Sequence, residues 1–434
     1  MFSKILVANR GEIAVRIIRA CKEMGIRTVA VYSMADAEAL HVALADEAVC
    51  IGKAEAADSY LNEERVVSAA LVTGAQAIHP GYGFLSENAH FAKMCQDNGI
   101  VFIGPSLENM DLLSDKEKIK RSMIEAELPV IPGSEVLESI EDAKKAAKKI
   151  GYPVMVKARS GGGGRGIRLV KTADELENAY HSAVAEGTAA FGDGAVYMEK
   201  YINPAKHIEM QVIADEFGNV VCLGERDCSI QKNNQKLIEE STSPVVSKEQ
   251  RDKLIEQVTR AVKHVNYLGV GTLEFLLDTE GNFYFMEMNV RLQVEHTVTE
   301  ALTGYDLVKW QIRVAAGIEL NFTQKDVDFT GSSIECRINA KAPGNLKFLH
   351  VPGGPFVRFD TFLVTGMTVS PYYDSLLGKL IVFAGTREEA IRKMKAALCE
   401  LVIDGIPNNI EEQIEYVSDP RFVDGTYNLN FFKK

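Results

Sequence analysis

Two glutamates and an asparagine lie where a β-hairpin could bring them together around a metal ion. Glu274 lies in one predicted strand, and Glu287 and Asn289 lie in the next one. If Glu280 and Gly281 between them form a two-residue turn, the two glutamates stand directly opposite each other, with the asparagine on the same face. Such a pair of carboxylates must share a proton or hold a cation, and Mg²⁺ or Mn²⁺ suits oxygen ligands. The alternative is a shifted register that leaves one glutamate in solvent.

Arg291, Gln293 and Glu295 follow the hairpin at alternate positions, so an extended chain would place all three side chains on one side. A carboxylate beside a metal pair and close to an arginine could act as a general base. The arginine could hold an oxyanion through two parallel hydrogen bonds. These residues therefore suggest acid–base chemistry on an anion, and a surface salt bridge is the alternative.

A second polar segment, Arg226–Lys236, precedes the hairpin and lacks regular apolar spacing. Polar stretches between periodic segments are typical of loops, and functional side chains are often carried on loops. We expect a functional loop in this segment, with a solvent-exposed coil as the alternative.

Four successive glycines, Gly161–Gly164, lie between predicted strands at 152–157 and 167–170. Without side chains, the backbone can approach an anion closely, and its N–H groups can converge on phosphate oxygens. The run lacks the G-x-x-x-x-G-K-[ST] pattern of a P-loop, but Lys157 and Arg165 lie beside it. These features predict a mobile cover over a nucleotide, and a flexible surface hairpin is the alternative.

The elements around these residues have the pattern of an α/β protein. Apolar runs predict strands at 4–9, 28–33, 75–79 and 100–103, and a helix at 12–24. This alternation predicts a doubly wound, Rossmann-like N-terminal unit, but the absence of G-x-G-x-x-G there disfavours dinucleotide binding. A charged helix is predicted at 140–150, a strand-rich region from 194 to 298, and a mixed α/β region after it.

Composition excludes several functional classes. The chain has 434 residues and a formal net charge of −12, which disfavours nucleic-acid binding. No apolar stretch is long enough for a membrane span, and the N-terminus does not resemble a signal peptide. The seven cysteines form no C-x-x-C pair, which favours a reducing compartment, and we expect a cytoplasmic protein.

The chain resembles biotin carboxylase, an ATP-grasp enzyme and component of acetyl-CoA carboxylase. The resemblance spans nearly the whole chain and rests on the segments Ala8–Ala14, His79–Asn88, Tyr197–Tyr201, Glu287–Asn289, Gln293–His296, Glu335–Ala340 and Pro371–Ser375. It implies a Rossmann-like N-terminal domain at 1–113 and an ATP-grasp linker and lid domain at 114–203, with the mobile glycine-loop lid at about 131–203. It also implies that 204–434 forms the ATP-grasp catalytic body and a mixed α/β C-terminal domain.

The resemblance implies a ligand set for ATP and metal. Lys116, Lys157, Gly163 and Gly164 would bind the phosphates, Glu199, Lys200 and Ile202 would border the adenine, and His207 and Gln231 would reach the ribose. Asn234 would lie near the nucleotide, where the family usually has a histidine. Glu274, Glu287 and Asn289 would bind Mg²⁺ or Mn²⁺.

The same resemblance implies a site for bicarbonate and biotin. Lys236, Arg291, Gln293 and Val294 would bind bicarbonate, Glu295 would act as its general base, and Arg337 and Tyr82 would contact biotin. Lys236, Arg291, Glu295 and Arg337 would be the catalytic residues. Bicarbonate would form carboxyphosphate, and the biotin would be attached to a separate carrier protein, because the chain has no Ala-Met-Lys-Met site.

The resemblance also implies a homodimer that works with a biotin carboxyl carrier protein and carboxyltransferase subunits in fatty acid synthesis. Three departures bear on activity: Asn234 replaces the usual histidine, Val290 replaces the usual threonine, and Lys341–Leu346 replaces a longer family segment. Two alternatives therefore remain open, namely another ATP-grasp carboxylate ligase and a degenerate nucleotide-binding scaffold with little turnover.

Overall fold

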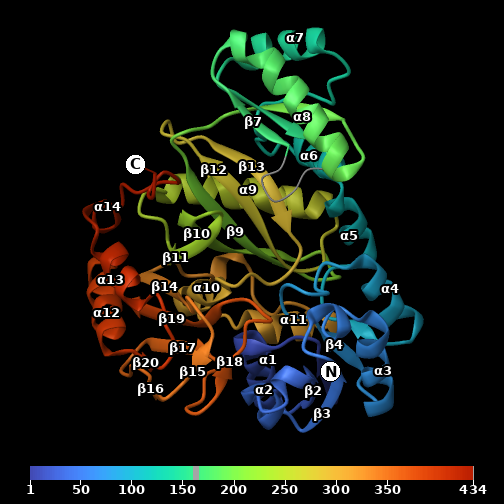
Figure 1. Ribbon diagram of the computed structural model, residues 1–434, viewed down its shortest axis with the longest axis vertical. Helices are drawn as coiled ribbons and strands as arrows, with labels where there is room; N and C mark the ends of the chain where they lie inside the picture. The colour runs from blue at the N-terminus through green and yellow to red at the C-terminus, as the bar shows by residue number, and fades with distance from the viewer. Residues whose placement is uncertain (160–165, 434) are drawn as a thin grey trace. The chain divides into compact units, whose positions relative to one another are not determined.

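The computed structural model describes residues 1–159 and 166–433 (Figure 1). The chain divides into two compact units. Unit 1 contains Met1–Leu128, Lys206–Phe275 and Glu287–Lys434, and unit 2 contains Pro129–Ala205 and Leu276–Met286. The glycine run, including Gly163 and Gly164, lies outside the described residues.

Unit 1 begins with a five-stranded parallel sheet in the order β3-β2-β1-β4-β5, drawn in blue in Figure 1. Its strands are β1 (Lys4–Val7), β2 (Arg27–Ser33), β3 (Glu47–Gly52), β4 (Ala77–His79) and β5 (Val101–Phe102). The helices between them are α1 (Gly11–Glu23), α2 (Leu40–Leu44), α3 (Glu63–Thr73) and α4 (Ala89–Asp97). Helix α1 packs against the face of β1 that carries Ile5 and Val7, and α3 and α4 share a core with Leu6 on the other face. The predicted doubly wound unit is confirmed.

Unit 2 contains a three-stranded antiparallel sheet in the order β7-β6-β8. Its elements are α7 (Ile140–Ile150), β6 (Val154–Ala158), β7 (Ile167–Val170), α8 (Leu176–Phe191) and β8 (Val196–Lys200). Strands β6 and β7, which flank the glycine run, pair antiparallel from Val154↔Val170 to Lys157↔Ile167. The two strands predicted beside the glycines are therefore confirmed.

An eight-stranded sheet, in the order β13-β12-β9-β10-β11-β14-β19-β17, forms the centre of the remaining chain. Its strands are β9 (Lys206–Ala214), β10 (Val220–Lys232), β11 (Gln235–Ser241), β12 (Gly269–Leu277), β13 (Phe283–Asn289), β14 (Ser332–Asn339), β17 (Val357–Thr361) and β19 (Leu376–Ala384). The other elements are α5 (Leu107–Ser114), α6 (Lys116–Glu125), α9 (Lys248–His264), α10 (His296–Thr303), α11 (Leu307–Ala315), β15 (Gly344–Asn345), β16 (Phe348–His350), β18 (Thr368–Val369), α12 (Arg387–Glu400), β20 (Val402–Asp404), α13 (Ile410–Ser418) and α14 (Pro420–Val423).

The segment Arg226–Lys236 is not a loop, so this prediction is wrong. It forms the end of β10, a tight turn at Asn233-Asn234 and the start of β11. Both turn residues have positive φ, 54° and 63°, a conformation that asparagine tolerates and that matches the twist of a two-residue hairpin. The strand was missed because its polar side chains are buried in the sheet instead of exposed.

The turn between β12 and β13 also differs from the prediction. The backbone N–H of Asp278 donates to Asn282 O at 3.1 Å, and the N–H of Gly281 donates to Asp278 O at 3.3 Å. These bonds close a three-residue loop over 279–281, with Gly281 at φ 86°, instead of the two-residue turn Glu280-Gly281. The prediction that Glu274 and Glu287 stand directly opposite each other assumed the two-residue turn, so the observed loop no longer supports that pairing.

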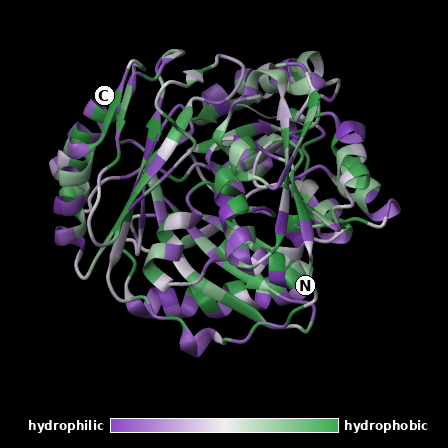
Figure 2. Ribbon diagram, turned by 90° about the horizontal axis from the view of Figure 1, so that it is seen from below, coloured by the Kyte–Doolittle hydropathy of each residue, from purple (hydrophilic) through white to green (hydrophobic). Residues whose placement is uncertain are grey.

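The two faces of the large sheet differ in character. Along β14, Ile334, Cys336 and Ile338 join a core that also contains residues of α12, whereas Glu335 and Arg337 alternate with them and project from the other face. Helix α10 packs against that polar face, where Thr297 donates a hydrogen bond to Glu335. Figure 2 shows green and purple residues alternating along several helices, as expected for helices with one apolar face. Among the described residues, no helix is both long enough and apolar enough to span a membrane.

Candidate functional site

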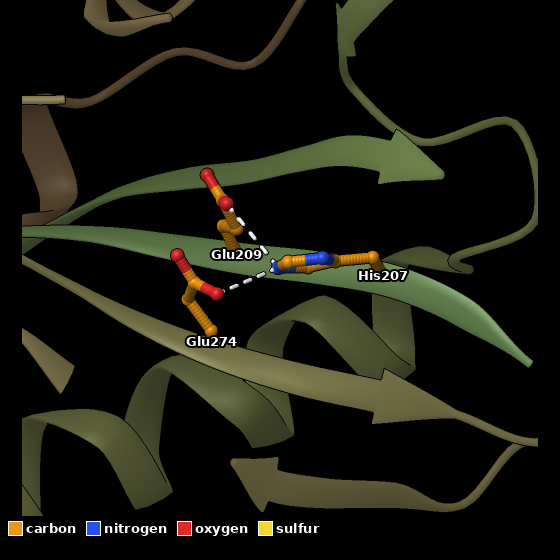
Figure 3. A group of neighbouring side chains, drawn as sticks. All are labelled: His207, Glu209 and Glu274. Atoms are coloured by element: carbon orange, nitrogen blue, oxygen red, sulfur yellow. Dashed lines mark ion pairs between the residues drawn. The ribbon is translucent and has the colours of Figure 1, made fainter. Parts of the chain in front are cut away.

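Three neighbouring side chains, His207, Glu209 and Glu274, lie on adjacent strands of unit 1 (Figure 3). Strand β9 presents His207 and Glu209 on one face because they are two residues apart, and β12 presents Glu274 beside them. His207 Nε2 lies 2.9 Å from Glu274 Oε2 and 3.3 Å from Glu209 Oε1. Although burial disfavours the imidazolium, Glu274 and Glu209 raise the pKa of His207 to about 9.

Lys236 joins this group to Glu295. Its Nζ contacts Glu209, lies 2.6 Å from Glu295 Oε1 and lies 3.5 Å from Glu274 Oε1. Burial works against ionisation of all three carboxyls, but the Lys236 ammonium is the largest opposing influence and holds each pKa below its usual range. Lys236 is therefore the main cation that keeps these three buried carboxylates ionised.

Arg226 is hydrogen-bonded to Glu209 of this group and is 0% exposed. All of its hydrogen-bonding nitrogens have partners: Glu209 Oε2 at 3.2 Å, Gln211 Oε1 at 2.6 Å, Thr299 Oγ1 at 3.0 Å, Thr272 Oγ1 at 3.0 Å and Gln293 Oε1 at 2.7 Å. A buried guanidinium is tolerated only when it is paired and fully hydrogen-bonded. Arg226 thus fixes the positions of Glu209 and Gln293.

The predicted metal ligands Glu274 and Asn289 are brought together. Asn289 Nδ2 donates to Glu274 Oε1 at 2.6 Å, and Gln293 Nε2 donates to the same oxygen at 2.7 Å. Glu274 is 5% exposed, whereas Glu287 lies on β13 and is exposed. A buried carboxylate and a neighbouring side-chain amide are the type of donors that Mg²⁺ takes, usually completed by water and substrate phosphates, so the chemistry of these residues fits the ion. Asn289 turns Nδ2 towards Glu274, so its amide would have to rotate to offer Oδ1 to the ion.

Arg337 on β14 and Glu295 form the other end of the site. Arg337 Nη2 donates to Glu295 Oε2 at 2.9 Å, and its Nε donates to Glu239 Oε1 at 2.6 Å. Glu295 is 2% exposed and lies in a turn that leads into α10. No residue from Arg291 to Glu295 belongs to a strand, so the extended run considered for this segment does not form. The Glu295 carboxylate is thus held between two cations, Lys236 and Arg337.

Arg291, Val294 and Tyr82 have other partners within unit 1. Arg291 Nη2 donates to Asn289 Oδ1 at 3.3 Å, and its Nε lies 3.2 Å from Glu87 Oε2. The Val294 carbonyl accepts a hydrogen bond from Lys379, and the Tyr82 hydroxyl contacts Glu12.

Gln231 lies beside His207, since its Nε2 is 2.8 Å from His207 Nδ1. The same Nε2 is 2.8 Å from the carbonyl oxygen of Cys228. Asn234 is exposed in the β10–β11 turn, where its positive φ accounts for an asparagine at this position.

Unit 2 carries a separate group of predicted nucleotide ligands. Lys157 on β6 forms an ion pair with Glu199 on β8 at 2.6 Å, and Lys200 donates to the carbonyls of Gly151 and Tyr152. Ile202 follows β8 in the same unit. The side chain of Lys116 lies outside the described part of the structure, although its backbone begins α6 in unit 1.

Glu209 and Glu239 were missed by the sequence predictions, and Arg226 was included only as the first residue of the segment predicted to be a functional loop. The alternation of His207, Glu209 and Gln211 along one strand could have indicated Glu209, because polar residues at every second position share one face. Arg226 and Glu239 had no comparable local signal. Together, the ionised carboxylates and the cations between them could bind an anion and remove a proton from it.

Three family models match the chain. "Biotin carboxylase, N-terminal domain" matches residues 1–110, "Carbamoyl-phosphate synthase L chain, ATP binding domain" matches 115–323, and "Biotin carboxylase C-terminal domain" matches 335–434. The chain is 52% identical to a biotin carboxylase of Nostoc, and the match covers 100% of this chain and 99% of that protein. It is 49% identical to the 2-oxoglutarate carboxylase small subunit of Hydrogenobacter thermophilus, over 100% of this chain and 94% of that protein.

Solved structures agree with these matches. The complex of a Campylobacter jejuni biotin carboxylase with β,γ-ATP has a TM-score of 0.94 and 48% identity, covering 99% of this chain and 98% of that one. The biotin carboxylase domain dimer of the Hydrogenobacter thermophilus 2-oxoglutarate carboxylase, with MgADP, ADP and bicarbonate, has a TM-score of 0.92 and 49% identity, covering 100% of this chain and 97% of that one.

Proposed function

The chain belongs to the biotin carboxylase family, and we propose that it performs the first half-reaction of acetyl-CoA carboxylase in fatty acid synthesis. It is an ATP-dependent carboxylating ligase that acts on biotin and uses ATP and Mg²⁺. Its proposed biotin is attached to a separate biotin carboxyl carrier protein, and carboxyltransferase subunits receive the carboxyl group. We propose a cytoplasmic homodimer.

In this proposal, the nucleotide is bound by Lys116, Lys157, Gly163 and Gly164 at its phosphates, by Glu199, Lys200 and Ile202 at its adenine, and by His207 and Gln231 at its ribose. Glu274, Glu287 and Asn289 hold Mg²⁺, which supplies positive charge that offsets the charge of the ATP phosphates. Asn234 lies near the nucleotide.

The observation that carries the proposal is the Glu295 carboxylate between Lys236 and Arg337, at 2.6 Å and 2.9 Å. Because these cations keep Glu295 ionised despite its burial, it can accept the proton of a bicarbonate bound by Lys236, Arg291, Gln293 and Val294. The deprotonated bicarbonate oxygen then attacks the γ-phosphorus, and the bond to the β,γ-bridging oxygen breaks to release ADP.

The resulting carboxyphosphate breaks its C–O bond to give CO₂ and phosphate, in a site that excludes water. The phosphate accepts the N1′ proton of biotin, and N1′ forms a bond to CO₂. Arg337 stabilises the negative charge that develops on the ureido oxygen, and Tyr82 borders the biotin.

Bicarbonate-dependent ATP cleavage with and without free biotin tests the activity. Stimulation by biotin supports the proposal, whereas turnover without a bicarbonate requirement indicates another carboxylate ligase. ATP binding without turnover indicates a scaffold. The variant Glu295→Gln, which keeps the shape of the side chain but removes the base, should lower the turnover number about 10²- to 10⁴-fold while nucleotide binding persists.

The acceptor is tested separately, since one similar protein is named for 2-oxoglutarate and not for acetyl-CoA. The chain is combined with the carrier protein and each candidate carboxyltransferase of its own organism. Labelled bicarbonate should then enter malonyl-CoA from acetyl-CoA. Transfer to a 2-oxo acid alone would contradict the assignment to fatty acid synthesis and leave the biotin carboxylase activity intact.

A further inference from the structure

Lys379 is a lysine of β19 that is 0% exposed and has no role in the proposed reaction. It lies directly opposite Arg337 on β14 and Asp360 on β17. Taking an ammonium group out of water is unfavourable unless hydrogen bonds and an opposite charge compensate it. The partners of Lys379 therefore indicate what this buried charge does.

The first partner belongs to the catalytic segment. Lys379 Nζ donates a hydrogen bond to the carbonyl oxygen of Val294 at 2.7 Å. This carbonyl lies in the same peptide plane as the backbone nitrogen of Glu295. A fixed direction for the Val294 carbonyl therefore also holds the Glu295 Cα, the atom from which the side chain extends.

The second partner is Glu12 of α1, whose Oε1 lies 3.2 Å from Lys379 Nζ and which is itself 4% exposed. The Tyr82 hydroxyl contacts the same Glu12 oxygen. Lys379 thus connects two segments: Glu12 in the N-terminal sheet region, and Val294 in a turn that lies more than 280 residues after Glu12 in the chain. Glu335 of β14 also faces this charge: burial raises the pKa of Glu335 to about 8, and Lys379 is the largest influence that opposes this shift.

We propose that Lys379 is a positioning residue, which holds the Val294–Glu295 peptide so that the Glu295 carboxylate stays between Lys236 and Arg337. The inference rests on the proposed role of Glu295 as the general base. Glu12 keeps the Lys379 ammonium in place, and Lys379 never contacts a substrate. Small displacements of a reacting group cost up to about 100-fold in rate, so this hydrogen bond should affect turnover more than binding.

Two variants separate positioning from a purely structural role. Lys379→Met keeps the length and apolar stem but removes the donor and the charge, which leaves Glu12 buried without its partner. The double variant Glu12→Gln/Lys379→Met removes both charges, and the glutamine can still accept a hydrogen bond from Tyr82. Glu12→Gln alone leaves the hydrogen bond from Lys379 to Val294 available and is the matched control.

We expect Lys379→Met to lose thermal stability and about 10- to 100-fold in the turnover number for biotin-dependent ATP cleavage, with little change in KM for ATP. The double variant should recover thermal stability but not turnover, and Glu12→Gln should keep more turnover than either. If the double variant recovers both properties, or if turnover follows thermal stability in all three variants, the positioning role is wrong.

The proposed function itself is checked in the same experiment by the unmodified protein. If that protein shows no dependence on bicarbonate and biotin, the proposed function fails, and the positioning role that rests on it fails with it. If it shows both dependences, the comparison of the variants judges Lys379 alone.

Discussion

At the residue scale, the candidate site depends on cations shared among buried carboxylates. Lys236 contacts Glu209, Glu274 and Glu295, and Arg226 fixes Glu209 from the other side. Isolated buried carboxylates would take up protons, but here their pKa values stay low because each one has a cation within contact distance. The same charges that stabilise the carboxylates could bind an anionic substrate.

The metal assignment leads to a prediction for Glu287. Glu287→Gln should severely weaken Mg²⁺-dependent ATP turnover and raise the Mg²⁺ concentration needed for half-maximal activity, because one charged ligand is lost. The fold should remain intact, since Glu287 is exposed on β13. Turnover is measured over a range of Mg²⁺ concentrations, and unfolding is followed by circular dichroism.

Glu280→Gln is the matched control for that experiment. It makes the same charge change at an exposed position in the loop of the same hairpin. We expect its Mg²⁺ dependence to equal that of the unmodified protein. Near-normal activity of Glu287→Gln at low Mg²⁺ would contradict the metal assignment.

At the element scale, strands β11 and β14 bring two acids directly opposite each other. Glu239 pairs with Glu335 in the antiparallel register, and both are 0% exposed. Burial raises the pKa of Glu239 to about 7 and that of Glu335 to about 8, although Arg337 and Lys379 respectively oppose the shift. The pair therefore remains at least partly protonated near neutral pH, as expected for like charges in adjacent positions.

This pair predicts a pH dependence of stability. The folded-state pKa values of both acids lie above the unfolded value near 4.5. The protonated pair therefore makes its full contribution to the free energy of unfolding below pH 4.5, and this contribution is lost as the pH rises through about 7 to 8. Glu335→Gln mimics the protonated acid, so it should reduce the loss of unfolding free energy between pH 5.5 and pH 8.5. Urea unfolding at several pH values measures this change.

The control is Glu256→Gln, at an exposed position of α9, which should leave the pH profile of the unmodified protein unchanged. An unchanged profile in Glu335→Gln as well would contradict the raised pKa of Glu335 in the folded protein.

At the scale of the whole molecule, buried neutral histidines limit stability in acid. Burial lowers the pKa of His41 to about 4 and the pKa of both His79 and His296 to about 3. The unfolded chain takes up these protons near pH 6.5, whereas the folded chain does not, so stability falls as pH drops from 6.5 toward the folded-state values.

For His79, the expected loss is about 2 kcal/mol between pH 7 and pH 5. His79→Asn removes the titratable group and can still accept the hydrogen bond that His79 Nδ1 receives from the Gly81 N–H. The variant should therefore lose less unfolding free energy than the unmodified protein over this range, as measured by urea denaturation. Equal losses in both proteins would mean that His79 does not remain neutral in the folded state.

The sequence by itself determined the elements whose signals are local. The four N-terminal strands predicted at 4–9, 28–33, 75–79 and 100–103, helix α7 and the strand pair around the glycine run follow from apolar periodicity and from glycine and proline positions, which act over a few residues. Strand β3 (Glu47–Gly52) was not predicted. The residues with acid–base chemistry, such as Glu274, Glu295 and Lys236, were also visible in the sequence or through its family motifs.

Only the tertiary structure decided which polar residues are buried and which groups they meet. Arg226 is polar in a segment that resembles a loop, yet its partners come from four parts of the chain, namely β9, β12, α10 and the turn before α10. Glu335 alternates with apolar residues as on a solvated sheet face, and Lys379 is the one charged residue in the apolar strand β19, but α10 packs against both strands. The physical reason is that burial depends on what packs against a face, and the packing elements lie far away in the sequence, beyond the reach of local pattern.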